Sequence, residues 1–398
     1  MSNFVKAITD GVKLMSRKDD DSYDRVSSRY SVGICVVFSA LVTGAMYIGD
    51  SIDCFTPAEF TVQWTKYTDQ YCWVKNTYYV PTTQNIPEHS QRKSLELTYY
   101  QWTPIILAFQ AFLFTIPGLL WKVFSSGAGY DIHHIVHLCI KDDNINPEKR
   151  DGVIAYVTSH LDRLLGYRRE YRSSGVARFR IAAQDKCCMI GKRYGNYLFI
   201  LYMVTKLGYI GVALFQLVAL NYVIGKGYHL YGLQVLSNLA QNKDWEASPF
   251  FPRVTLCDFV LRKMGANLQT YTVQCVLPWN LFNEKIYLFL WWWLVFVIAV
   301  SAFGFLVWCM TLLPNSNVRW VGKYLKVMHR LDGASDQERQ LVKEFTNRYL
   351  RQDGVFVLRM MAIQVTDLTT AEVVCSLWDR FVSYRSKSVD ELPAPKDV

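Results

Sequence analysis

Hydrophobic residues gather in four long stretches, and polar residues separate these stretches along the chain. Residues 31–49, 97–121 and 286–313 carry no charged side chain, and residues 194–225 carry one, Lys206. A helix of about 20 mostly apolar residues crosses the hydrocarbon core of a bilayer, so each stretch suits one span. The pattern therefore predicts an all-α membrane protein built on a bundle of four transmembrane helices.

The four stretches divide the chain into spans, loops and terminal regions, and aromatic side chains such as Tyr30 and Trp121 mark the span ends. The first 30 residues are polar, which favours a retained first span over a cleaved leader. We expect an N-terminal segment at 1–29, spans at 30–49, 97–121, 194–225 and 286–313, loops at 50–96, 122–193 and 226–285, a C-terminal helical region at 314–385, and a disordered tail at 386–398.

The distribution of Lys and Arg predicts the orientation of the spans. Residues 1–30 contain 6 of these cations, residues 122–193 contain 13 and the region from 314 onward contains 13, whereas residues 50–96 contain 4 and residues 226–285 contain 6. Because cytoplasmic segments are enriched in Lys and Arg, both termini and the middle loop are assigned to the cytoplasm. This asymmetry also explains the net charge of +9 without a nucleic-acid partner.

Two cysteine pairs lie in the two loops that are assigned to the outside. Cys54 and Cys72 are 18 positions apart, as are Cys257 and Cys275. Disulfides persist in oxidising compartments, so the pairs agree with the charge argument and predict two loops joined into one extracellular cap. Four cysteines allow three pairings, which the spacing alone does not decide.

Apolar residues at helical spacing predict a cytoplasmic helical layer made from the middle loop and the tail. Pro147 suits the first turn of a helix whose apolar stripe runs from Val153 to Leu165. Two capping boxes in the tail, Ser335 to Glu338 and Thr369 to Glu372, each precede another stripe. In the second span, Pro104 and Pro117 predict a kinked helix.

Side chains that could carry chemistry are few and scattered. His133, His134 and His137 form a small cluster, which we interpret as a helix face because a di-iron site needs more ligands than the chain offers. Lys206 is the only ionisable residue deep in a span; we favour a structural role, paired within the bundle, over a functional one. Without a recognisable catalytic, metal or cofactor motif, the sequence favours a channel or adhesion protein over an enzyme.

The head of the second span carries a tetrapeptide that resembles the signature of the innexins, the invertebrate gap-junction proteins. Tyr99-Tyr100-Gln101-Trp102 is followed by Thr103-Pro104, where the family usually has Val before the proline. Residues 71–78 and 353–360 are also similar to the family, and the resemblance covers nearly the whole chain. Pannexins share the plan but lack the full tetrapeptide.

The resemblance implies a large-pore channel in the plasma membrane at cell–cell junctions, passing ions and small molecules. Its subunits would form a ring of six to eight, with the octamer favoured, alone or with other innexins, among membrane lipids and docked to a ring in the apposed cell. Innexin-like channels join Cys54 to Cys275 and Cys72 to Cys257, and their N-terminal residues line the pore, here Ser2, Asn3, Phe4, Val5 and Lys6.

Docking between two rings would use polar groups that lie between the cysteines of the outer loops. Amide and hydroxyl groups there favour hydrogen bonds and trapped water over salt bridges, and the candidate residues are Gln63, Thr65, Asn267, Gln269 and Thr270. Two alternatives remain open: an unpaired, pannexin-like hemichannel, and an adhesion protein similar in plan to the claudins.

Overall fold

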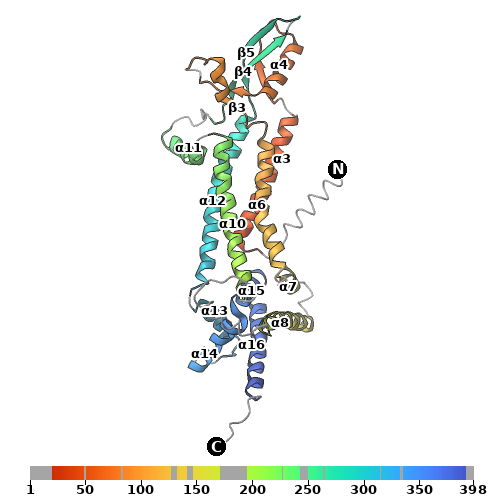
Figure 1. Ribbon diagram of the computed structural model, residues 1–398, viewed down its shortest axis with the longest axis vertical. Coiled ribbons are helices and arrows are strands. Elements are labelled where there is room, and N and C mark those ends of the chain that lie inside the picture. The colour runs from red at the N-terminus through yellow and green to blue at the C-terminus, as the bar shows by residue number, and fades with distance from the viewer. Residues whose placement is uncertain are drawn as a thin grey trace, which may run out of the picture. The chain divides into compact units, whose positions relative to one another are not determined.

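The computed structural model (Figure 1) describes residues 20–48, 51–81, 84–126, 132–140, 147–170, 195–225, 227–242, 250–262, 265–313, 315–331 and 335–390. The chain divides into two compact units. The helical unit comprises residues 1–28, 116–209 and 301–398, and the sheet unit comprises residues 29–115 and 210–300. Each division falls inside one of four long apolar helices.

These four helices are long and apolar enough to cross a membrane, which confirms the predicted four-span architecture. The first is continuous from α2 (Ser22–Arg25) through the π-helical turn η1 (Val26–Tyr30) to α3 (Ser31–Ile48). The others are α6 (Thr103–Ser126), α10 (Tyr197–Val223) and α12 (Asn280–Met310). The second helix starts six residues later than its apolar stretch, because residues 97–102 form a strand end and a turn.

The sheet unit contains a five-stranded antiparallel sheet that the sequence analysis did not predict. Its strand order is β1-β5-β4-β2-β3, so the hairpin of the second loop pairs with strands of the first loop on both of its sides. The first loop supplies β1 (Asp53–Phe55), β2 (Thr77–Tyr78) and β3 (Glu96–Leu97), and the second supplies the hairpin of β4 (Val254–Arg262) and β5 (Leu268–Val276). The two loops thus form one folded body.

Short helices complete the sheet unit. In the first loop these are α4 (Val62–Lys75), α5 (His89–Arg92) and the 3₁₀ turn η2 (Lys93–Leu95). In the second loop they are η4 (Tyr228–Leu230) and α11 (Tyr231–Ala240). Figure 1 shows α4 lying beside the β4–β5 hairpin, which it contacts along β4.

The helical unit is a layer of helices around one apolar core, as predicted from the stripes. Its elements besides the span ends are α7 (Ile132–Ile140), α8 (Pro147–Glu170), α13 (Ser316–Val327), α14 (Asp336–Glu344), η5 (Phe345–Leu350), α15 (Arg351–Gln364) and α16 (Asp367–Asp390). Val157 and Leu161 of α8 are buried with Phe356 of α15 and Trp378 of α16 in this core.

Three local features differ from the sequence analysis. Thr369 and Glu372, the expected capping box, lie inside α16. Thr366 caps the helix instead, because its hydroxyl accepts a hydrogen bond from the Thr369 amide over 3.3 Å. Pro104 occupies the first turn of α6, where a missing amide hydrogen disrupts no helical bond, so only Pro117 lies in the helix interior. Finally, α16 continues to Asp390, past the start expected for the disordered tail.

Candidate functional site

Two disulfides join the first loop to the second within the sheet unit. Cys54 on β1 is bonded to Cys275 on β5, and Cys72 on α4 is bonded to Cys257 on β4, the pairing that the family resemblance implies. All four cysteines are at most 3% exposed. Because Cys54 and Cys275 are also partner residues in the ladder between β1 and β5, the covalent link and the strand pairing fix the same register.

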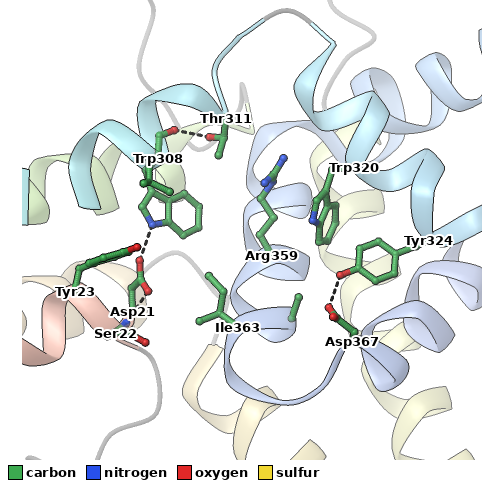
Figure 2. A pocket seen from close by; sticks show the side chains of 12 residues that line it. Asp21, Ser22, Tyr23, Trp308, Thr311, Trp320, Tyr324, Arg359, Ile363 and Asp367 are labelled. Carbon is green, nitrogen blue, oxygen red and sulfur yellow. Dashed lines mark hydrogen bonds between the residues drawn. The ribbon is translucent and has the colours of Figure 1, made fainter. Parts of the chain in front are cut away.

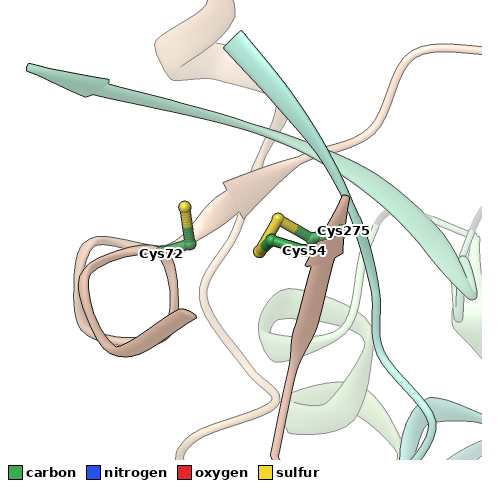
Figure 3. A group of neighbouring side chains, drawn as sticks. All are labelled: Cys54, Cys72 and Cys275. Carbon is green, nitrogen blue, oxygen red and sulfur yellow. A yellow bond between two sulfur atoms is a disulfide. The ribbon is translucent and has the colours of Figure 1, made fainter. Parts of the chain in front are cut away.

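The sulfur atoms of Cys54, Cys72 and Cys275 lie within 4.8 Å of one another. Figure 3 shows the three side chains as neighbours. Metal binding by cysteine requires a thiolate, and each of these sulfurs is held in a disulfide. The group therefore forms the buried covalent centre of the sheet unit and offers no ligands to a metal.

A buried carboxylate ties the first loop to β4. Asp258 accepts hydrogen bonds from Arg92 (2.8 Å), Thr272 (2.7 Å) and the hydroxyl of Tyr78 (3.0 Å). Burial alone would raise the pKa of Asp258, but these donors and the Arg92 charge hold it below the ordinary value. Burial and the neighbouring carboxylate raise the pKa of Tyr78 to about 12, so its hydroxyl stays a donor at neutral pH.

The family tetrapeptide anchors α4 to the head of the second span. The Gln101 amide donates to the backbone oxygen of Trp73 and, over 3.2 Å, to the side chain of Asn76. Tyr99, which is buried, donates to Asn280 at the head of α12 over 3.2 Å. Tyr100 is buried as well, whereas Trp102 is exposed. The motif thus connects the disulfide-linked loops to the first residues of α6 and α12.

The candidate docking residues fall into two groups on the sheet unit. Asn267, Gln269 and Thr270 are exposed at the tip of the β4–β5 hairpin, and Gln63 is exposed in the first turn of α4. Thr65 is half-buried, and its hydroxyl lies 3.0 Å from that of Thr56. The ring of Phe60 packs 5.4 Å from Tyr271 on β5, bringing the start of α4 next to that hairpin.

The exposed face of the stapled loops is more apolar than the sequence analysis expected. Leu268, Phe55 and Val62 are 59%, 82% and 87% exposed. Leu268 opens β5 at the tip of the hairpin, where residues 268–270 are all exposed; farther along, the strand alternates between an exposed and a buried face. A docking surface here therefore combines amide groups with apolar contacts.

In the helical unit, buried charges tie the first described residues to the span ends. Lys206 on α10 is 1% exposed and its ammonium lies 2.8 Å from Asp24 and 3.7 Å from Asp21. Asp24 also accepts a hydrogen bond from the Tyr202 hydroxyl over 2.6 Å. Asp21 accepts one from the Trp308 indole over 3.0 Å, a bond that Figure 2 draws as a dashed line. This N-terminal anchor gives Lys206 the paired, structural position that we favoured.

The anchor also depends on a close approach to α12. A Cβ atom at Gly304 would lie 2.8 Å from the Cβ of Tyr23, so only glycine fits without moving the N-terminal segment. Arg25 extends the attachment to α15 by donating to Gln364 over 2.6 Å. The candidate pore residues Ser2, Asn3, Phe4, Val5 and Lys6 lie outside the described residues.

A cavity of about 400 Å³ opens beside this anchor, between Tyr23 and Trp308 on one side and Trp320 and Tyr324 on the other (Figure 2). Arg359 crosses it, with its guanidinium 4.9 Å from the Trp320 ring and 3.2 Å from the Asn317 side chain. Burial lowers the pKa of Arg359. We interpret these side chains as packing that supports the N-terminal anchor.

Sequence reasoning found the cysteines, the tetrapeptide and Lys206, but it missed the carboxylate partners of Lys206 and Arg92. Asp21 ends a run of three acidic residues and Asp24 follows three positions later, a pattern that is more often solvated than buried. Asp258 is one charge within a strand whose neighbours are apolar. A charged residue inside an apolar strand or span is a signal for a buried pair, though its partner cannot be named from sequence.

Comparison with known proteins agrees with these features. The family model described as innexin matches residues 20–381. The chain is 34% identical to innexin unc-9 of Caenorhabditis elegans over 365 residues, 91% of this chain and 92% of that protein. It is 33% identical to innexin-6 of the same organism (95% and 93% covered) and 31% identical to innexin eat-5 (94% and 90%). The four spans, the stapled loops and these matches together show that the chain belongs to the innexin family, whose members form gap-junction channels.

Proposed function

We propose that this channel protein assembles as a closed ring and docks to a ring in the apposed cell through the tip of its β4–β5 hairpin and the start of α4. The observation that carries the proposal is the pair of inter-loop disulfides. They hold residues from both loops on one rigid body and leave the hairpin tip exposed. A surface that must meet its counterpart across water gains from such preorganisation.

The pore is proposed to lie between subunits. Four helices, each about 10–12 Å across with its side chains, pack on one another and leave no wide lumen. Closed cyclic symmetry is the usual way to surround a central channel with copies of one chain. The six-to-eight-subunit ring, with the octamer favoured, follows from the family resemblance.

The two loops of the sheet unit are proposed to lie outside the cell and both termini inside. The loops of the sheet unit hold 10 of the 43 Lys and Arg residues, and the disulfides suit an oxidising compartment. In this orientation the N-terminal anchor lies at the cytoplasmic end of the first span. Residues 2–6 would then extend from the anchor into the pore mouth.

Paired-cell recording tests this function directly. Cells that express the chain should show junctional conductance when paired and dye uptake when unpaired. Dye uptake without junctional conductance would identify an unpaired hemichannel, and the absence of both would contradict the channel. Imaging of purified particles down the ring axis gives the subunit number, and a monomer or an open chain of subunits would overturn the ring.

A further inference from the structure

A groove with an apolar floor and a basic rim lies between α13 and α14 of the helical unit. Its volume is about 640 Å³. The floor is formed by Val318 and Val327 of α13, Leu331 of the connection and Val342 of α14, with Gly322 between them. Val342 is buried, whereas Val327 is 64% exposed. The groove thus presents hydrocarbon to the solvent on a surface that is otherwise charged.

The rim of the groove is strongly positive. Five cations line it against a single carboxylate, Glu338; the cations are Arg319, Lys323, Lys326, Arg339 and Lys343. All five are exposed. Arg339 lies 3.5 Å from Asp336, an exposed pair of little strength. Within the described part of the chain, the other four cations have no carboxylate partner.

Three of these cations repeat along one face of α13. Arg319, Lys323 and Lys326 stand at positions i, i+4 and i+7, where like charges repel across successive turns. Such a row lowers the stability of an isolated helix, and an external anion would relieve the repulsion. The charge pattern therefore indicates an anionic partner for this face.

The groove lies close to the end of a candidate span. α12 ends at Met310 and α13 begins at Ser316. Five residues lie between them, so even a fully extended connection would separate Met310 from Ser316 by at most about 22 Å. The rim residue Arg319 follows in the first turn of α13. Basic clusters directly beside a span on the cytoplasmic side attract the anionic lipids of that leaflet.

We propose that this groove binds an anionic phospholipid of the adjacent leaflet. The phosphate would lie among Arg319, Lys323 and Lys326, and part of an acyl chain would lie on the valine floor. An amphiphile matches both halves of the groove, whereas a soluble phosphate would leave the floor uncovered. The proposal rests on the proposed orientation, because anionic lipids are concentrated in the cytoplasmic leaflet.

The test uses the full-length protein in nanodiscs of phosphatidylcholine with or without phosphatidylserine. Lipid that stays bound after detergent exchange is identified and counted by mass spectrometry. Wild-type protein should retain phosphatidylserine selectively, and Lys323→Gln combined with Lys326→Gln should lower its apparent affinity about tenfold or more. The matched control is Arg348→Gln, a 79% exposed cation of the same unit that does not line the groove.

A second variant separates the floor from the rim. Val327→Ser should weaken retention of the long-chain lipid while leaving binding of dihexanoyl phosphatidylserine unchanged.

Equal binding by wild type and the double Lys variant would overturn the site. Competition by inositol phosphate at the same affinity as the lipid would assign the rim to a soluble anion instead. If truncation after Asp390 raises lipid retention, the chain's own acidic end occupies the groove and the lipid assignment is wrong.

Lipid retention needs neither docking nor conductance. A channel that couples cells but binds no anionic lipid contradicts this inference alone. Conversely, a chain that retains phosphatidylserine but forms no channel contradicts the proposed function alone.

Discussion

Different interactions stabilise the sheet unit and the helical unit internally. In the sheet unit, two disulfides and a five-stranded ladder fix the loops, while Phe55, Val62 and Leu268 remain exposed. In the helical unit, a continuous apolar core buries residues from α7, α8 and α13–α16, and one ionic cluster is enclosed near the span ends. Two disulfides reduce the dependence of the sheet unit on a buried core, whereas the helical unit depends on its core for stability.

Removal of one disulfide should have the largest effect in this comparison. Cys54→Ser with Cys275→Ser removes the link between β1 and β5, and the loss of a native disulfide typically costs about 2–5 kcal/mol. We expect junctional conductance to be abolished, as measured in paired cells. Cys309→Ser, which replaces a free cysteine of the helical unit, is the matched control and should couple normally.

Peptide mapping sharpens the same test. Proteolysis under non-reducing conditions should release peptides that join Cys54 to Cys275 and Cys72 to Cys257. Recovery of Cys54 joined to Cys72 would contradict the stapled-loop arrangement.

In the helical unit, the most sensitive residue should be Lys206. Lys206→Met leaves Asp24 and Asp21 buried without their cation, which typically costs about 3–5 kcal/mol. We expect a lower melting temperature of the solubilised protein. Adding Asp24→Asn removes one uncompensated charge and should recover part of the loss. If the single variant melts like wild type, the N-terminal anchor does not hold the first span.

A charge at the hairpin tip should block docking without unfolding the sheet unit. Asn267→Asp places one charge per subunit at the hairpin tip, and a docked pair of rings repeats it around the axis. We expect junctional conductance to fall at least tenfold while surface expression and hemichannel current persist, because the side chain is exposed. Gln84→Glu, also exposed in the first loop, is the control for added charge. Loss of hemichannel current in the Asn267 variant would instead assign the hairpin a role in folding.

The two units also differed in how far their sequences predicted them. The spans and the helices of the helical unit were predicted because helical periodicity is local, as the buried Val157 and Leu161 show. The sheet was not: β2 and β3 are two residues long, and β2 pairs with the distant β4 as well as with β3. The β4–β5 hairpin is local, but its alternation was overlooked. The four disulfide cysteines and Lys206 were identified from the sequence by their residue type. The carboxylates that pair with Arg92 and Lys206 were not, because partners separated by 166 and 182 residues leave no local sequence pattern.

The smallest expected effect concerns Asp258 and the acid stability of the sheet unit. Its pKa is lowered in the folded protein relative to its ordinary value of 3.8, so its ionised form stabilises the fold. That contribution is fully present above about pH 4 and is lost as pH falls through the folded pKa. Asp258→Asn removes charged hydrogen bonds, which contribute about 1.5–3 kcal/mol each at most, and the remaining amide still accepts from Thr272 or Tyr78.

The measurement is the melting temperature of the solubilised protein from pH 8 to pH 3. Wild type and Asp258→Asn should differ by a constant amount from pH 8 to pH 5, and the difference should narrow below about pH 4 as the wild-type carboxylate is protonated. His89, whose ring nitrogen lies 3.6 Å from the same carboxylate, is replaced by Gln in both proteins so that the two differ only at position 258. A difference in melting temperature that persists unchanged at pH 3 would show that Asp258 acts through its shape alone. Its charge would then contribute nothing to the attachment of the first loop to β4.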